Sequence, residues 1–193
     1  MNLVIVDVGC GNIGSVAIAF ERFGLAPRVT AEPAEISSAD KVILPGVGAA
    51  GYAMEQIRAR GLVEPLRDLT QPVLGICLGM QLLFERSEEE DTECLGIVPG
   101  EVRRLEPARG RPVPHMGWSR LSVAHPQIGL AEGDYVYFAH SFACDPGAET
   151  VASADYGRTI PAVIRKANWW GAQFHPERSG AAGARFLERF LAA

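Results

Sequence analysis

A cysteine and a histidine–glutamate pair occur in two separate segments, and their residue types fit acyl-transfer chemistry. Residues 73–81 read Val-Leu-Gly-Ile-Cys-Leu-Gly-Met-Gln, and residues 173–177 read Gln-Phe-His-Pro-Glu. Together they supply a thiol nucleophile in Cys77, a base in His175 and an acid in Glu177 that can orient the base. These three side chains predict a thiol acyl-transfer enzyme.

The segment around Cys77 has the form of a nucleophile elbow, the sharp turn between a strand and a helix. A short apolar run precedes Cys77 and a helix-compatible stretch follows it, with Gly75 and Gly79 on either side. Glycines let the strand and the helix approach closely because they carry no Cβ atom. The thiol then lies near the amino end of a helix, where free N–H groups and the helix dipole favour an anion. This placement favours the reactive thiolate, since a free cysteine has a pKa of about 8.5.

The spacing of His175 and Glu177 suits a base and the acid that orients it. Residues two apart in an extended segment point to the same face, and Pro176 between them marks the end of a strand. Glu177 can therefore fix the histidine tautomer while the other ring nitrogen faces Cys77. An isolated cysteine is usually a small buried apolar residue, and an isolated histidine is usually structural. An elbow cysteine together with a strand-end His-Pro-Glu indicates catalysis.

Composition excludes several classes of function. Of 193 residues, 48% are apolar and 21% are charged, which is enough for a core and typical of one domain over residues 1–193. The net charge of −5 argues against nucleic acid or an anionic membrane as the main partner. The apolar runs are far shorter than the roughly 18 residues of a membrane span, and the amino-terminal segment reads as a buried strand, not a signal peptide.

The four cysteines predict a reducing, cytoplasmic location. Cys10, Cys77, Cys94 and Cys144 are scattered, and no two of them form a C-x-x-C pair. This spacing is typical neither of a disulfide framework nor of a zinc site. We therefore expect no metal centre and no cofactor.

Apolar runs alternate with helical patterns in the first half of the chain, which predicts an α/β protein with a parallel sheet and helices on both faces. The expected strands are residues 3–7, 27–30, 41–44 and 73–77, and the expected helices are residues 13–23, 51–60 and 78–85. The carboxyl edge of such a sheet is where ligands bind. We expect Cys77 and the loops at residues 9–12 and 45–48 to lie together at this edge of the sheet.

The second half changes character, with strands joined by short polar or Gly/Pro turns, so several should be antiparallel. The expected strands are residues 98–105, 113–115, 135–141, 151–156, 162–166 and 169–174. A final helix over residues 179–191 has Ser179 as its predicted N-cap.

The cysteine and histidine motifs resemble those of the class I (triad) glutamine amidotransferases, and the resemblance extends over essentially the whole chain. It implies a flavodoxin-like three-layer sandwich that takes ammonia from L-glutamine through a thioester at Cys77. Residues 45–48 (Pro-Gly-Val-Gly) match the oxyanion strand of that family. The resemblance thus points to the backbone N–H groups of Val47 and Leu78 as the oxyanion hole. Without the cysteine motif, this segment would read as an ordinary strand-to-helix turn.

A second glycine-rich loop superficially matches a dinucleotide-binding fingerprint. Gly9, Gly11 and Gly14 have the spacing G-x-G-x-x-G after a strand and before a helix. No ribose-binding acid ends the next strand, which closes at Thr30, with Glu32 just beyond it. The loop also matches the amidotransferase subunit pattern Asp-Tyr-Gly-x-Gly-Asn, so nucleotide binding is disfavoured.

Four segments narrow the resemblance to the glutaminase subunits of imidazole glycerol phosphate synthases. They are the early Asp7–Asn12 loop, residues 45–49, residues 114–118 (Pro-His-Met-Gly-Trp) and residues 137–142 (Tyr-Phe-Ala-His-Ser-Phe). In that family the partner is a (β/α)₈ cyclase subunit in a heterodimer, and ammonia passes through the barrel. The resemblance assigns to the partner interface Asn12, His115, Met116 and Trp118. From sequence alone, a core position for Trp118 is about as probable.

The same resemblance implies a glutamine pocket. Its side chains would be Gln81 and Glu89, and its backbone groups would come from Val47, Gly48, His140, Ser141 and Phe142. Gln81 lies four residues after Cys77 and so shares its helical face. Glu89 lies in the acidic run 88–91, where a solvated carboxylate is an equally good explanation.

Three alternatives remain open. The chain could be the glutaminase subunit of anthranilate or pyridoxal phosphate synthesis, a cysteine hydrolase or peptidase on a related scaffold, or a silent interaction module. The segments around Gly9–Asn12 and Pro114–Trp118 argue against the first, and the complete set of catalytic side chains argues against the last. Val8, Ala50 and Ile160 depart from the family pattern without touching the proposed chemistry.

Overall fold

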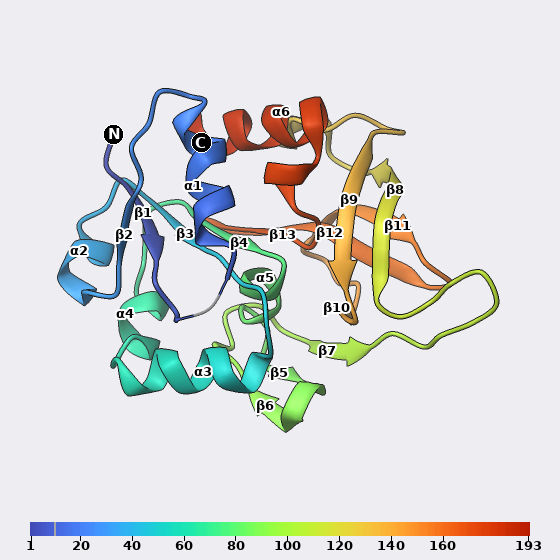
Figure 1. The fold of residues 1–193 in the computed structure, drawn as a ribbon, viewed down its shortest axis with the longest axis horizontal. Helices are drawn as coiled ribbons and strands as arrows, with labels where there is room; N and C mark the ends of the chain where they lie inside the picture. The colour runs from blue at the N-terminus through green and yellow to red at the C-terminus, as the bar shows by residue number, and fades with distance from the viewer. Residues whose placement is uncertain (10) are drawn as a thin grey trace.

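The computed structural model describes residues 1–9 and 11–193, so Cys10, one of the four cysteines considered above, lies outside the described residues. Within them, a nine-stranded sheet runs in the order β2-β1-β3-β4-β13-β12-β11-β8-β9 (Figure 1). In that order the strands span Arg28–Thr30, Leu3–Val6, Lys41–Leu44, Val73–Ile76, Trp169–Ala172, Thr159–Lys166, Thr150–Asp155, His115–Val123 and Tyr135–His140.

The sheet divides into the two halves that the sequence predicts. The pairs from β2 to β13 are parallel, and the pairs from β13 to β9 are antiparallel. Every residue of β1, β3, β4 and β13 is buried. These strands are covered on both faces, which explains why they read as continuous apolar runs in the sequence.

Helices form a layer on each face of the parallel half (Figure 1). One layer holds α1 (Ile13–Glu21) and α6 (Gly180–Leu191), and the other holds α2 (Pro33–Ser37), α3 (Ala50–Ala59) and α4 (Val63–Arg67). Side chains alternate along each strand, so Leu3 and Ile5 pack in the first layer's core and Val4 in the second's. The three-layer α/β fold is therefore confirmed.

A small second sheet lies below the antiparallel half, in the order β10-β7-β5-β6 (Figure 1). Its strands span Phe142–Cys144, Glu101–Arg104, Arg86–Ser87 and Thr92–Glu93. Of the predicted strand at 98–105, only the four residues of β7 form a strand, and of the predicted strand at 113–115, only His115 does, as the first residue of β8, which runs to Val123. These short strands are fixed by their pairing partners, which the sequence pattern does not reveal.

The helix that follows Cys77 is shorter than predicted. The sequence predicts a helix over residues 78–85, but α5 spans only Leu78–Gln81. The carbonyls of Leu82, Leu83 and Phe84 accept hydrogen bonds from backbone N–H groups of residues 95–98. The helix ends before these residues because the Leu83 and Phe84 N–H groups donate only three residues back, to Met80 and Gln81, and the Glu85 N–H donates to the Gly100 carbonyl.

Two kinds of feature are absent from the described residues. Among residues 1–9 and 11–193, no helix combines the length and apolarity that crossing a bilayer requires. The same part of the chain contains no cluster of three or more His, Cys, Asp or Glu side chains arranged to hold a metal ion.

Candidate active site

Cys77 lies in a sharp turn between β4 and α5, as predicted. Its backbone has φ 53° and ψ −110°, in the positive-φ region that residues with a Cβ atom rarely adopt. Its N–H donates to the Ala172 carbonyl of β13 at 2.7 Å, so the neighbouring strand holds the turn. A Cβ atom on Gly79 would overlap the Leu44 carbonyl oxygen. Glycine at position 79 is therefore what lets the elbow pack against β3.

His175 and Glu177 form a buried pair next to Cys77. Nδ1 of His175 lies 2.8 Å from Oε1 of Glu177, and their side chains are 7% and 2% exposed. Burial lowers the pKa of His175. Hydrogen bonds to Cys77 and Glu177, and the charges of these two groups, outweigh burial and raise that pKa to about 10. The raised pKa favours the protonated ring of His175 between Cys77 and Glu177, an arrangement that suits a thiol acyl-transfer enzyme.

The strand order explains why residues about a hundred positions apart meet. β13 lies beside β4, with Ala172 opposite Ile76, so the segments that leave the two strands emerge at the same edge. The His175 N–H donates to the Tyr137 carbonyl of β9 at 2.9 Å, which fixes the segment after β13.

Ser179 also positions His175, and this role differs from the predicted one. Ser179 occupies the N-cap position of α6 but makes no side-chain capping bond. Its hydroxyl instead donates to the His175 carbonyl at 2.6 Å and accepts from the Tyr137 N–H at 3.0 Å. The predicted N-cap position is therefore confirmed, but the hydroxyl binds the histidine segment to β9 and does not cap the helix.

A cavity of about 200 Å³ opens in front of the cysteine. Its lining includes the nucleophile and every residue predicted for the oxyanion hole and the glutamine pocket. The lining residues are Val47, Gly48, Cys77, Leu78, Gln81, Glu89, Pro114, Ala139, His140, Ser141 and Phe142. Segments from five parts of the chain thus converge on one site.

One of the two predicted oxyanion donors is already engaged. The Leu78 N–H donates to the Gly46 carbonyl at 3.3 Å. A Cβ atom at Gly46 would lie 2.7 Å from the backbone nitrogen of Gly79, so the 46–48 segment packs directly on the elbow. An oxyanion can bind the Leu78 N–H only after the Gly46 carbonyl leaves it.

Gln81 is buried and held by a second glutamine that the sequence reasoning did not assign. Nε2 of Gln81 donates to the Phe142 carbonyl at 2.7 Å and to Oε1 of Gln173 at 3.0 Å. Gln173 is fully buried, and its own Nε2 lies 3.8 Å from Sγ of Cys77. Gln173 precedes His175 by two positions, so strand alternation is the signal that could have identified it.

Glu89 points into the cavity and not into solvent. Its Oε2 accepts a 2.8 Å hydrogen bond from the Ala50 N–H at the start of α3. Partial burial raises the pKa of Glu89, which the bond to Ala50 partly opposes and the charge of Glu90 reinforces. Glu88, Glu90 and Asp91 are therefore the exposed members of the acidic run, whereas Glu89 is partly buried.

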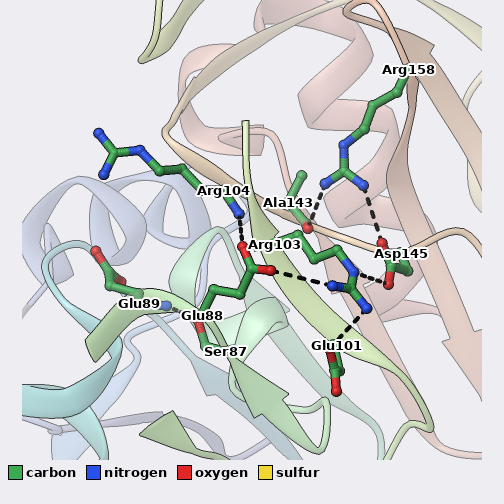
Figure 2. A network of polar contacts seen from close by, with 9 residues as sticks. All are labelled: Ser87, Glu88, Glu89, Glu101, Arg103, Arg104, Ala143, Asp145 and Arg158. Atoms are coloured by element: carbon green, nitrogen blue, oxygen red, sulfur yellow. Dashed lines mark hydrogen bonds and ion pairs between the residues drawn. The ribbon is translucent and has the colours of Figure 1, made fainter. Parts of the chain in front are cut away.

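Figure 2 shows the network of polar contacts that joins the segment preceding Glu89 to β7 and β10. Arg103 contacts Glu88 at 3.3 Å and Asp145 at 2.8 Å. Arg158 contacts Asp145 at 3.1 Å and donates to the Ala143 carbonyl of β10 at 2.9 Å. Because these side chains are at least partly exposed, solvent screens each ion pair.

A sequence profile of the family described as "Glutamine amidotransferase class-I" matches residues 4–193. The chain belongs to this family. Two relatives carry the description "Imidazole glycerol phosphate synthase subunit HisH". The protein of Idiomarina loihiensis is 50% identical over 193 residues, covering 99% of this chain and 97% of that protein. The Escherichia coli protein is 48% identical over 198 residues, covering 99% of both.

Solved structures of other glutamine amidotransferases and their relatives share the fold. The crystal structure of one glutamine amidotransferase has a TM-score of 0.77 and 20% identity, over 98% of this chain and 97% of that one. PurLQS from Thermotoga maritima has a TM-score of 0.73 and 19% identity, over 99% and 97% of the two chains. At this identity the likeness confirms the fold class alone.

The predicted docking residues of this amidotransferase separate into two groups. Met116 and Trp118 are 67% and 54% exposed, which removes the core explanation for Trp118. Asn12 is also exposed, and its side chain caps α1 by accepting a 3.4 Å hydrogen bond from the Ser15 N–H. His115 is only 2% exposed, because alternation along β8 turns its side chain inward. The His115 side chain is therefore not part of an exposed docking surface.

The buried pair His115 and His140 predicts that the amidotransferase loses stability in acid. Burial lowers the pKa of each to about 4. An unfolded histidine takes up its proton near pH 6.5, so between pH 6.5 and 4 the unfolded chain binds more protons and stability falls as the pH falls. His175 opposes this only in part, since the stability from its raised pKa is fully present only below about pH 6.5.

Urea denaturation should therefore give a free energy of unfolding about 3 kcal/mol lower at pH 5 than at pH 7, because His115 and His140 each remove roughly 2 kcal/mol and His175 restores roughly 1 kcal/mol. In a His115→Phe variant, which lacks one of the two titrating rings, the difference should be smaller. Equal pH slopes for the wild type and this variant would contradict the assignment.

Proposed function

We propose that this amidotransferase is the glutaminase subunit of an imidazole glycerol phosphate synthase in histidine biosynthesis. The observation that carries the chemistry is the buried His175–Glu177 pair beside Cys77, at a cavity of about 200 Å³ that Cys77 lines. Relatives with that description at about half identity over nearly the whole chain support the choice of synthase.

In the proposed reaction, the Cys77 thiolate attacks the side-chain amide carbon of glutamine. The carbonyl oxygen becomes an oxyanion, which the N–H groups of Val47 and Leu78 stabilise. The His175 imidazolium then gives its proton to the amide nitrogen, and ammonia leaves as the thioester forms. Water, deprotonated by the now neutral His175, attacks the thioester. Glutamate is released, and the thiolate–imidazolium pair is restored.

The size of the cavity argues against a peptidase. Its volume of about 200 Å³ is below the roughly 300–1,000 Å³ of pockets for drug-sized ligands, which suits a single amino acid. Gln81 and Glu89 would lie at the end of the cavity that takes the α-ammonium and α-carboxylate groups of glutamine, with backbone groups of Gly48, His140, Ser141 and Phe142 completing the pocket. A cysteine hydrolase acting on extended substrates would need an open groove here.

The proposed partner is a (β/α)₈ cyclase subunit, docked on the exposed face of β8 and β9 in a heterodimer. Met116, Trp118 and Tyr135 form an exposed apolar group on these adjacent strands. Aromatic and methionine side chains are enriched in interfaces, and Asn12 would lie at the rim. A partner is also chemically useful, because ammonia in water is mostly protonated, and an enclosed route keeps it nucleophilic.

Ammonia delivered in this way would react in the barrel with the formimino-aminoimidazole-carboxamide nucleotide. The products would be imidazole glycerol phosphate and aminoimidazole-carboxamide ribotide. We further propose a cytoplasmic location. The three cysteines in the described part of the chain, Cys77, Cys94 and Cys144, are free and buried, which suits a reducing compartment.

The test compares glutamate release by the protein alone and with the cyclase and its nucleotide substrate. We expect weak hydrolysis alone and strong stimulation by the partner. A Trp118→Ala variant should weaken association by about 2–4 kcal/mol, because exposed aromatic anchors dominate interface energy. Isothermal titration calorimetry measures this loss.

Val29→Ala is the matched control, because Val29 is 45% exposed but lies on β2, at the opposite edge of the sheet. It should leave association unchanged. Equal glutamate turnover with and without the cyclase would exclude the proposed gating. Stimulation only by an anthranilate or pyridoxal phosphate synthase partner would assign the chain to another synthase.

A further inference from the structure

Two buried imidazoles next to the glutamine cavity form a hydrogen-bonded chain that the proposed mechanism does not use. Nδ1 of His115 lies 3.1 Å from Nε2 of His140. Nε2 of His115 lies 2.9 Å from Oγ of Ser119, and Nδ1 of His140 lies 2.8 Å from the Phe142 carbonyl oxygen. His115 and His140 are 2% and 5% exposed. All four ring nitrogens therefore have a partner within the protein.

The partners fix where each proton lies. A carbonyl oxygen can only accept, so the Phe142 carbonyl requires a proton on Nδ1 of His140. Neutral His140 then accepts at Nε2, so His115 donates from its Nδ1. His115 in turn accepts at Nε2 from the hydroxyl of Ser119. Both rings are thus neutral Nδ1–H tautomers, and protonation of His140 would set two N–H groups against each other.

Packing against aromatic rings holds the two hydrogen-bonded imidazoles in place. The ring of His115 is stacked between those of Phe138 and Tyr156, with centroids 4.8 and 3.8 Å away. The charged groups that act on His140 are His175 and Arg158, both of which disfavour a second positive charge there. The rings of Phe138 and Tyr156 thus fix the His115 imidazole, and its hydrogen bond fixes the His140 imidazole.

The hydrogen bonds from Ser119 through the two imidazoles end at the Phe142 carbonyl, which also binds Gln81. The Phe142 carbonyl accepts both from His140 and from Nε2 of Gln81, at 2.8 and 2.7 Å. Gln81 continues to Gln173, whose Nε2 lies 3.8 Å from Sγ of Cys77. A continuous series of polar contacts therefore runs from Ser119 on β8 to the nucleophile.

We propose that His115 and His140 are positioning residues for glutamine binding, acting through the Phe142 carbonyl to fix the Gln81 side chain in the cavity. The proposal rests on the proposed function, since it concerns the same site. It adds two residues whose side chains need not touch the substrate. It also explains why an inward-facing histidine lies on β8, the strand that carries Trp118 on its other face.

The test uses steady-state glutamine hydrolysis by the complex with the cyclase. A His115→Phe variant keeps a ring between Phe138 and Tyr156 but removes both ring nitrogens. We expect the KM for glutamine to rise about 5- to 10-fold with kcat within about threefold, because an interaction made equally in the ground and transition states is lost.

Two further variants separate positioning from a general structural effect. His115→Asn can still donate toward His140 from its side-chain amide, so its KM should stay within about threefold of wild type. Tyr156→Phe keeps the ring on His115 and removes only the hydroxyl bond to the Pro112 carbonyl. Its KM should be unchanged. A wild-type KM in His115→Phe, or equal KM increases in all three variants, would overturn the proposal.

A measurement independent of activity covers the case in which His115→Phe does not fold. Nitrogen-15 NMR of the histidine rings in the wild-type protein should show both His115 and His140 as neutral Nδ1–H tautomers at pH 7. An Nε2–H tautomer or an imidazolium at either position would overturn the proposal. If the wild-type complex released no glutamate, the proposed function would fail as well. A normal wild type with an unaffected His115→Phe would overturn this inference alone.

Discussion

The Cys77→Ser variant is expected to lose glutamine hydrolysis by about 10⁴-fold or more in kcat. A serine hydroxyl is a far weaker nucleophile than a cysteine thiolate, which the proposed mechanism requires beside the His175–Glu177 pair. Serine is nearly isosteric with cysteine, so the elbow, with its φ of 53° at this position, should be retained. Glutamate release in the presence of the cyclase measures the effect.

Ammonia-dependent synthesis provides the internal control for this variant. When ammonium salts replace glutamine, the complex with Cys77→Ser should make imidazole glycerol phosphate at the wild-type rate, because the barrel performs that step. Loss of both activities would indicate a disrupted interface instead of a missing nucleophile. Retained glutamine hydrolysis would rule out Cys77 as the nucleophile.

The Gly79→Ala variant is expected to show the largest loss of stability, about 3 kcal/mol or more. The added Cβ atom would overlap the Leu44 carbonyl oxygen, which belongs to the backbone of the buried strand β3. A backbone atom cannot rotate away as a side chain can, so either β3 or the elbow must shift. Chemical denaturation measures the loss, and glutamine hydrolysis should fall with it because Cys77 lies on the same turn.

Gly14→Ala is the matched control for this substitution. Gly14 lies near the start of α1, and no atom lies within 4 Å of the position its Cβ would take. Alanine there should leave stability unchanged or raise it by up to about 1 kcal/mol, since glycine is a poor helix former. Equal destabilisation by both variants would show that close packing against β3 is not the cause.

The parallel half of the fold and the turn that carries Cys77 could be predicted from local patterns. The buried strands β1, β3 and β4 appear in the sequence as apolar runs, and the elbow appears as glycines on both sides of Cys77. These features depend on neighbours within a few residues. A sequence displays such features directly.

The remaining features depend on contacts between distant segments. The Glu85 N–H donates to the distant Gly100 carbonyl where α5 has already ended, and the role of Ser179 results from the approach of β9. The burial of His115 and the exposure of Trp118 are opposite because they lie on opposite faces of β8. Tertiary packing decides which face of β8 is covered, and the local sequence pattern does not predict it.

The place of β13 has a consequence for how the protein is made. β13 follows all the other strands in sequence, yet it pairs with β4 on one side and β12 on the other. Until a ribosome has synthesised it, both of those strands expose an unpaired edge, which favours aggregation. The segment that carries His175 and Glu177 follows β13 directly. A nascent chain, or one truncated before this segment, therefore cannot hydrolyse glutamine until β13 has paired with β4 and β12.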